Sequence, residues 1–216
     1  ILKTRRDIID RNGSVVATNV ILYDVGVRPK LLNKEQKKNL LVKLGLLFPE
    51  LNLSIIRQKL KKDNFFTIGK RLTPKEKDQF WLMANKAFVF DPKSSRIYPQ
   101  KNLFSHILGQ TDDANEGISG IEKFFNENLK NNEKINDPLR LTIDLNLQHL
   151  IRDELINAQL NFNNIGSAAI LMDVENGSII SLVSLPDFDL NRRISILDSI
   201  YTNKITHGVY ELGSVF

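Results

Sequence analysis

Two apolar runs separated by a short polar turn constrain the fold of this chain most strongly. Residues 166–174 and 178–184 are rich in Ala, Ile, Leu and Val, and Glu175-Asn176-Gly177 lies between them. Because Asn-Gly supplies the positive φ angles of a two-residue turn, the pattern predicts a β-hairpin with a type I′ turn. In neither run do apolar and polar residues alternate strictly. We therefore expect both strands to be covered on both faces, as in the centre of a sheet sandwiched by helices.

The segment before this hairpin predicts a domain boundary followed by a strand and a helix. Residues 130–138 are polar, have turn chemistry and show no periodicity, so we interpret them as a linker between two domains. Residues 139–143 read as a strand, and Asp144 is a good helix N-cap. The apolar residues that follow at helical spacing are Leu147, Leu150, Ile151, Leu155 and Ala158.

The region before residue 138 mixes strands with helices. Residues 5–27 predict two strands joined by a turn at Asn12-Gly13. Asn33 and Asn52 are expected to cap helices, and Thr73-Pro74 with a following acid opens a third. We therefore predict an α+β fold, with a helical lobe at about 31–90 inserted into a strand-rich domain of residues 1–138.

The net charge of +5 and a pI near 9.3 raise the question of nucleic-acid binding. The lysines are spread over the chain, and the densest group is Lys59, Lys61 and Lys62 at the end of a predicted helix. No aromatic residues alternate with them as stacking platforms would require. We interpret these lysines as a solvated face and expect no nucleic-acid partner.

Metal-binding and membrane-spanning patterns are absent from the sequence. There is no cysteine, and His106, His149 and His207 are separated by 43 and 58 residues. We expect no metal site and no cofactor. No apolar run approaches the ~20 residues that a bilayer-spanning helix needs. Because the chain starts at Ile1 rather than Met, we expect a fragment that lacks an N-terminal segment.

Ser214 is the candidate nucleophile. A lysine after Phe216 would complete Ser-x-x-Lys, and on a helix this spacing lets the amine take the proton of the hydroxyl. That lysine is not in the sequence. The alternative for Ser214, which follows a glycine, is a helix N-cap.

Eight short motifs follow one another through the chain. They are RRDIIDRNG at 5–13, RIYP at 96–99, HILG at 106–109, GISGIE at 117–122, LTIDLNLQ at 141–148, AAILMDVENG at 168–177, SLPDFDLN at 184–191 and YELGSVF at 210–216. In this order they resemble the class B penicillin-binding proteins, most closely the division-specific, FtsI-like members. The resemblance implies that residues 1–138 are a non-catalytic pedestal domain. Residues 139–216 are implied to hold the first helix and hairpin of a transpeptidase domain, truncated after Phe216.

The same resemblance implies a function for the intact protein. Ser214 would be the acyl nucleophile of a D,D-transpeptidase that crosslinks peptidoglycan stem peptides at the septum, and β-lactams would acylate the same serine. Its partners would include other cell-division proteins. The protein would lie in the periplasm on one N-terminal inner-membrane anchor, absent from this chain. The fragment lacks the lysine and the later motifs, so we expect it to be inactive. The alternative is a non-enzymatic scaffold or penicillin sensor.

Two departures and one charged pair complete the sequence evidence. Arg6 stands where such proteins often have Gly, and Leu212 replaces the usual Pro before Gly-Ser. We hypothesise that Arg5 or Arg11 pairs with Glu122 and ties the N-terminal hairpin to the later helix. The alternative is that all three side chains face water. His106 is interpreted as a packed or surface histidine.

Overall fold

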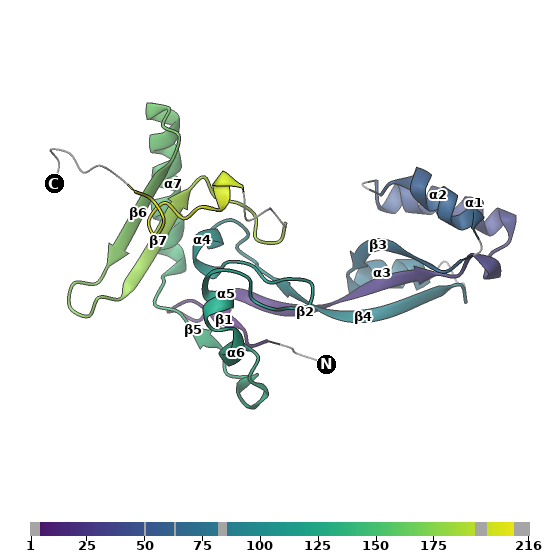
Figure 1. Ribbon diagram of the computed structural model, residues 1–216, viewed down its shortest axis with the longest axis horizontal. Coiled ribbons are helices and arrows are strands. Elements are labelled where there is room, and N and C mark those ends of the chain that lie inside the picture. The colour runs from purple at the N-terminus through teal and green to yellow at the C-terminus, as the bar shows by residue number, and fades with distance from the viewer. Residues whose placement is uncertain (1–4, 50, 63, 82–85, 193–197, 210–216) are drawn as a thin grey trace. The chain divides into compact units, whose positions relative to one another are not determined.

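The computed structural model describes residues 5–49, 51–62, 64–81, 86–192 and 198–209. It contains two compact units (Figure 1). The main unit is Ile1–Val20 with Ser95–Phe216, and the inserted unit is Ile21–Ser94. The chain crosses the boundary twice, first along strand β2 (Val15–Val27) and again along β4 (Phe88–Ile97).

The inserted unit holds helices and strands within a short stretch of sequence. Besides parts of β2 and β4 it contains η1 (Pro29–Leu31), α1 (Lys34–Leu47), α2 (Leu53–Lys61), β3 (Phe66–Leu72) and α3 (Pro74–Trp81). Strand β3 runs antiparallel to β2, with Tyr23 opposite Leu72 and Val27 opposite Phe66. The mixed α and β character expected from the sequence is confirmed.

Polar side chains fix where the helices of this unit begin. Asn33 accepts a hydrogen bond from the Gln36 amide, and the Gln36 side chain accepts one from the Asn33 amide, so a complete capping box starts α1. Asn52 caps α2. Thr73 forms the same kind of box with Glu76 at the start of α3. All three predicted helix starts are confirmed.

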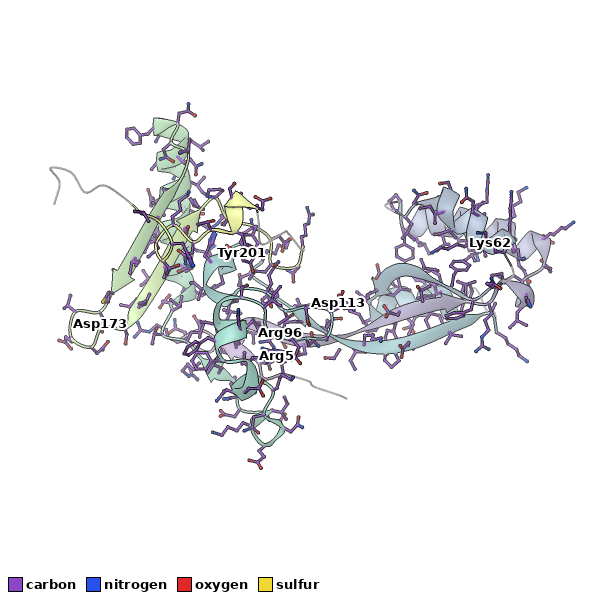
Figure 2. The ribbon with its side chains drawn as sticks, in the orientation of Figure 1. Arg5, Lys62, Arg96, Asp113, Asp173 and Tyr201 are labelled. Atoms are coloured by element: carbon purple, nitrogen blue, oxygen red, sulfur yellow. The ribbon has the colours of Figure 1, made fainter. Side chains whose placement is uncertain are left out.

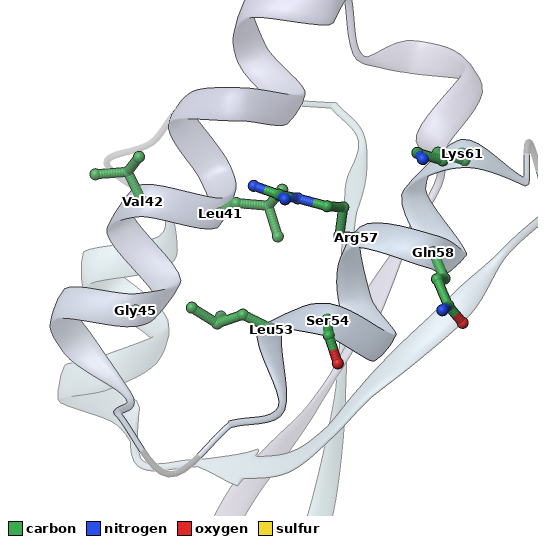
Figure 3. A pocket seen from close by; sticks show the side chains of 8 residues that line it. All are labelled: Leu41, Val42, Gly45, Leu53, Ser54, Arg57, Gln58 and Lys61. Carbon is green, nitrogen blue, oxygen red and sulfur yellow. The ribbon is translucent and has the colours of Figure 1, made fainter.

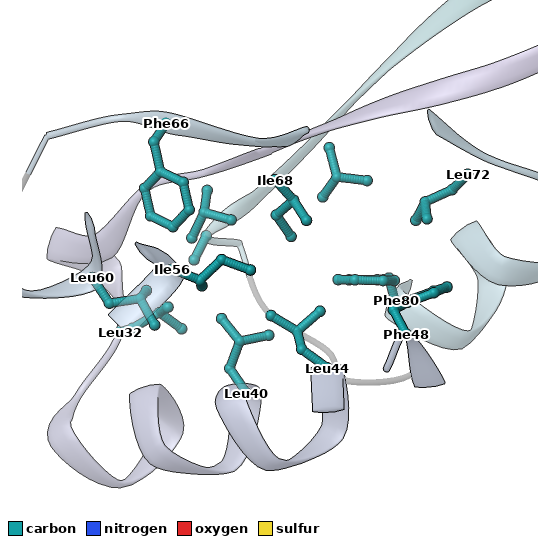
Figure 4. Close-up of a cluster of buried hydrophobic side chains, with 13 residues drawn as sticks. Leu32, Leu40, Leu44, Phe48, Ile56, Leu60, Phe66, Ile68, Leu72 and Phe80 are labelled. Atoms are coloured by element: carbon teal, nitrogen blue, oxygen red, sulfur yellow. The ribbon is translucent and has the colours of Figure 1, made fainter. Parts of the chain in front are cut away.

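The inserted unit has its own hydrophobic core (Figure 4). Leu40 and Leu44 of α1 meet side chains from α2 and β3, and Phe80 of α3 stacks on Phe48 with ring centroids 5.6 Å apart. Each fully buried Leu, Ile or Phe side chain contributes about 1.5–3 kcal/mol to folding. This core explains why so short an insertion folds as a compact unit.

The main unit combines a small sheet, short helices and a separate hairpin. Its elements besides β2 and β4 are β1 (Ile8–Ile9), α4 (Ser105–Leu108), α5 (Gly120–Phe124), α6 (Asn126–Leu129), η2 (Asn132–Lys134), β5 (Leu139–Arg140), α7 (Leu145–Phe162), β6 (Ser167–Met172), β7 (Ile179–Leu185) and η3 (Ser199–Tyr201). Strand β1 lies between β2, which is antiparallel to it, and β5, which is parallel. No helix in the described parts of the chain has the length and apolarity needed to cross a bilayer.

Both predicted hairpins form, but their turns differ from the prediction. In the first, Gly13 has a φ of +93°, whereas Asn12 is not in the left-handed region, and the Asp10 amide donates to Ser14 O. In the second, only Gly177 has a positive φ, and the Asp173 amide donates to Ser178 O. The predicted type I′ turn is therefore wrong. The loop is longer than two residues, and one glycine at its end supplies the left-handed conformation.

The prediction that both strands of the second hairpin are buried on both faces is also wrong within the described residues. Strand β7 is the more buried of the pair, but most of β6 is exposed, including Ile170 and Met172. Helix α7 packs on both strands, yet Leu150 points to solvent and the fully buried residue of α7 is Gln148. An apolar pattern shows only that a strand can be covered. It does not show which part of the chain covers it.

Candidate functional site

The predicted nucleophile Ser214 lies outside the described residues, as does the rest of 210–216. The described chain before it, residues 198–209, begins with η3. We call residues 198–209 the approach segment. Its contacts and the buried charges of the main unit define the candidate site.

His106 of α4 is the main anchor of the approach segment. Its Nε2 lies 2.9 Å from the carbonyl oxygen of Ile200, and a carbonyl can only accept, so Nε2 carries the proton. Nδ1 therefore accepts from Ser105 Oγ at 3.3 Å. The Asn203 side chain donates back to the carbonyl of His106. Both ring nitrogens are occupied, so His106 acts as a structural tie.

Aromatic and hydroxyl groups hold the rest of the approach segment. The ring of Tyr201 stacks on Phe188, with centroids 5.2 Å apart, and its hydroxyl donates to Ser119 Oγ. The Lys204 amide donates to Ser184 Oγ at 3.0 Å, next to the end of β7. The chain that leads toward Ser214 is thus fixed to β7 and to the helices of the main unit.

A cavity of about 520 Å³ lies where the approach segment meets α4 and the start of α5. The polar groups that line it include Ser105, His106, Ser119, Lys123, Tyr201 and His207. Within the described residues, no three His, Asp or Glu side chains are placed to hold a metal ion.

Burial lowers the pKa of His106 below the 6.5 of a free histidine, because the imidazolium form is poorly solvated there. Asp187 opposes this shift, and Lys204 adds to it. The folded chain therefore binds fewer protons at His106 than the unfolded chain does. The stability that depends on neutral His106 is present above pH 6.5 and is lost as the pH falls toward the lowered value.

We expect acid to loosen the approach segment. Hydrogen exchange in residues 198–209, corrected for the intrinsic pH dependence of exchange, should rise between pH 7.5 and pH 5. The variant His106→Gln keeps a donor for Ile200 but removes the titrating ring, so its corrected exchange should not change with pH. His149→Gln, on the exposed side of α7, is the matched control and should behave as the parent. A pH response that survives in His106→Gln would contradict this assignment.

Three charged side chains form a buried cluster in the main unit. Glu122, in the first turn of α5, accepts from Arg5 through Oε2, at 2.8 Å from Nη2 and 3.1 Å from Nε. Its other oxygen, Oε1, accepts from Arg96 Nε at 2.7 Å. The side chains of Arg5 and Glu122 are 0% exposed and that of Arg96 is 1% exposed. Arg5 and Arg96 lie close together in Figure 2.

Backbone and amide oxygens satisfy most of the remaining donors. Arg5 Nη1 donates to Asn115 O and to the side chain of Asn126, and its Nη2 also reaches the carbonyl of Glu122. Arg96 Nη1 donates to Arg6 O at 2.8 Å. Arg96 Nη2 is the donor of this cluster for which no partner is found among the described atoms. A cluster this closed cannot admit a substrate, so its role is structural.

Two glycines of the GISGIE motif allow close backbone packing around the start of α5, which carries Glu122. A Cβ at Gly117 would lie 2.0 Å from the carbonyl oxygen of Glu122. Gly120, the first residue of α5, has a φ of +56°, which favours glycine. A side chain at Gly117 would therefore collide with the backbone of Glu122, and one at Gly120 with the backbone of Ile107–Gly109.

Of the two pairs proposed from the sequence, the structure contains the one between Arg5 and Glu122. Arg11 is exposed at the first hairpin turn. Sequence reasoning missed Arg96, although the RIYP motif that begins with it was recognised. Arg6, which stands where such proteins often have Gly, is buried, and its side chain donates hydrogen bonds to Asn128 and to Asp137.

Gln148 is a second polar anchor that sequence reasoning did not single out. It is 1% exposed, and its amide nitrogen donates to the carbonyls of Leu103 and Leu182. Its amide oxygen accepts from Ser181 Oγ and from the Leu182 amide. All four hydrogen-bonding positions of the side chain are used. Gln148 thus fixes α7 to β7 and to the loop before α4.

Comparison with known proteins identifies the family. Residues 1–137 match the family described as the Penicillin-binding Protein dimerisation domain. That match covers more than half of the chain, and the chain therefore belongs to this family, within the class B penicillin-binding proteins.

The relatives that are similar in sequence include proteins named as peptidoglycan D,D-transpeptidases and a sporulation protein. The chain is 27% identical, over 98% of its length, to the probable peptidoglycan D,D-transpeptidase FtsI of Caulobacter vibrioides. It is 26% identical, over 98% of its length, to the stage V sporulation protein D of Bacillus subtilis. The chain spans 36% of the first relative and 37% of the second.

A solved structure shares the fold. The chain matches the penicillin-binding protein PBP2 in a complex between PBP2 and MreC from Helicobacter pylori, with a TM-score of 0.63 and 23% sequence identity. The match covers 94% of this chain and 47% of that one. At this level of identity the likeness establishes the fold alone.

Proposed function

We propose that this chain is part of a peptidoglycan D,D-transpeptidase that crosslinks septal stem peptides during bacterial cell division, with Ser214 as its nucleophile. The observation that carries the proposal is the match, over nearly the whole chain, to relatives named as D,D-transpeptidases. On this proposal residues 1–138 are the pedestal and residues 139–216 begin the transpeptidase domain. The apolar residues that β6 exposes support an interface of residues 139–216 with a further segment or partner, because such a surface is typical of an interaction site.

The proposed reaction is acyl transfer. Ser214 Oγ attacks the carbonyl carbon between two terminal D-alanines, a lysine three residues later takes the hydroxyl proton, and the peptide bond breaks. The terminal D-alanine leaves after its nitrogen accepts a proton, and an ester to Ser214 remains. The amine of a neighbouring stem peptide then attacks the ester, forms the crosslink and restores the serine hydroxyl. Backbone N–H donors beside Ser214 stabilise the oxyanion, each typically worth about 3–4 kcal/mol.

The contacts of the approach segment give the described residues a part in this proposal. His106, Tyr201 and Lys204 hold the chain shortly before Ser214 against the main unit. A nucleophile gains from such support because small displacements from the reacting carbonyl are costly.

Division proteins are the proposed partners of the pedestal, and the periplasmic side of the inner membrane, with an N-terminal anchor, is the proposed location. The fold neighbour PBP2 was solved in a complex with another protein, MreC, and this supports a protein partner for the pedestal.

A comparison of the intact protein with the 216-residue chain tests the proposal. A fluorescent penicillin should label the intact protein covalently and leave the 216-residue chain unlabelled, because residues 1–216 do not contain the lysine and the later motifs that the proposed mechanism requires. Release of D-alanine with formation of crosslinked dimers from a disaccharide-pentapeptide polymer should accompany labelling. Labelling without crosslinking would favour the penicillin sensor, and absence of both would favour the scaffold. A labelled 216-residue chain would show that the missing part is not required for acylation.

A further inference from the structure

A surface groove runs between α1 and α2 of the inserted unit, and two of its lining residues, Leu41 and Leu53, also pack against the core. It has a volume of about 580 Å³. The groove is lined on the α1 side by Leu41, Val42 and Gly45, and on the α2 side by Leu53, Ser54, Arg57, Gln58 and Lys61. Figure 3 shows Leu53 and Arg57 extending from α2 toward α1.

The floor of the groove is apolar. Gly45 brings the two helices together, because a Cβ there would lie 2.9 Å from Leu53 Cδ1. Leu40 and Leu44 of α1 are used by the core, but Val42 and Leu46 are 57% and 78% exposed. Helix α1 therefore carries more apolar surface than its own core covers, which is typical of an interaction site.

The wall formed by α2 is polar and basic. Ser54, Arg57, Gln58 and Lys61 follow one another at intervals of three, one and three residues, so they lie along one face of the helix. The inserted unit as a whole has sixteen Lys and Arg against seven Asp and Glu, a net charge of +9, whereas the entire chain has +5. The basic residues are thus concentrated here, contrary to the even spread inferred from the sequence.

We propose that this groove binds an acidic amphipathic helix of a partner protein. Apolar side chains of such a helix, spaced at i, i+3, i+4 and i+7, fit between α1 and α2 over Leu41 and Leu53. Carboxylates on its flank then meet Arg57 and Lys61 and the surrounding positive field. The nine residues of α2 extend about 13 Å, so two to three turns of bound helix run along it.

The shape of the groove favours a helix over a membrane surface. Leu41 and Leu53 are half-buried between the helices, where an inserted side chain reaches them but a flat headgroup layer does not. This proposal concerns recognition by the inserted unit. It goes beyond acyl transfer and does not depend on Ser214.

Two designed peptides and one kind of vesicle test the proposal on the 216-residue chain. The first peptide is a fluorescein-labelled amphipathic helix of about 18 residues with Leu at the spacing above and Glu on its flanks. The second has Lys in place of every Glu. Fluorescence anisotropy at 50 mM and 200 mM salt should give binding of the acidic peptide at least about tenfold tighter than that of the basic one, and weaker at the higher salt. Backbone amide shifts on binding should map to residues 41–61.

Charge reversal in the groove supplies the matched variants. The double variant Arg57→Glu, Lys61→Glu should lose about tenfold in affinity for the acidic peptide and gain for the basic one. The control Lys30→Glu, Lys75→Glu changes the net charge equally at exposed lysines that do not line the groove, and should lose less than about threefold. Equal binding of both peptides, or equal losses in the two variants, would overturn the proposal. Binding only to phosphatidylglycerol vesicles would also overturn it and assign the surface to a membrane.

Discussion

Replacing Glu122 by Ala should lower the free energy of unfolding of this chain by about 3–5 kcal/mol, because it leaves two buried guanidinium groups without their carboxylate. Arg5 and Arg96 would each lose charge-assisted hydrogen bonds in a place that water does not reach. At an m-value of about 2 kcal/mol/M, the midpoint in urea should fall by about 1.5–2.5 M.

The measurement is urea unfolding followed by circular dichroism, with hydrogen exchange to locate the change. Protection should fall first in the segments that the cluster joins, around β1, the end of β4 and α5. Glu154→Ala, at an exposed position of α7, is the matched control and should stay within about 0.5 kcal/mol of the parent. A loss for Glu122→Ala no larger than that of the control would show that the cluster does not hold the main unit together.

The local structure of the inserted unit could be predicted well from the sequence because its signals are local. Asn33, Asn52 and Thr73 each cap the helix that follows them, and a cap needs only residues within one turn. The concentration of basic residues in this unit was not predicted, because the net charge of the unit can be counted only once its first and last residues are known.

The candidate site could be predicted only in part, since its partners are distant in sequence. Glu122 was expected to meet one arginine and meets two, from positions 117 and 26 residues away. A carboxylate has two oxygens, and the sequence does not show how many donors converge on it. Gln148 entered the sequence analysis only as the last residue of the LTIDLNLQ motif, whereas its buried side-chain amide makes four hydrogen bonds.

The hairpin of β6 and β7 shows a different limit. Its two strands and their antiparallel pairing follow from the apolar runs, but the turn and the cover of β6 do not. Turn type depends on whether one or two residues adopt positive φ, and only Gly177 does. Whether β6 is buried depends on segments that are distant from it in the sequence. The periodicity of the strand itself does not show which segments these are.

Replacing Ser214 by Ala in the intact protein should abolish both covalent penicillin labelling and crosslinking, since no other hydroxyl would stand at the position of the proposed nucleophile. The loss should exceed about 10³-fold in acylation rate, as for nucleophiles of serine enzymes that act with a base. The variant should unfold at the same urea concentration as the parent, which separates lost chemistry from lost folding. Ser199→Ala, in η3 of the approach segment, is the matched control and should retain labelling.

The most direct test of the account is to identify the residue that carries the acyl group. After the intact protein reacts with penicillin, mass spectrometry of its proteolytic peptides should find the added mass on the peptide that contains Ser214, and on Ser214 itself after fragmentation. The added mass on another residue, or its absence from an intact protein that crosslinks stem peptides, would contradict the assignment of Ser214 as the nucleophile.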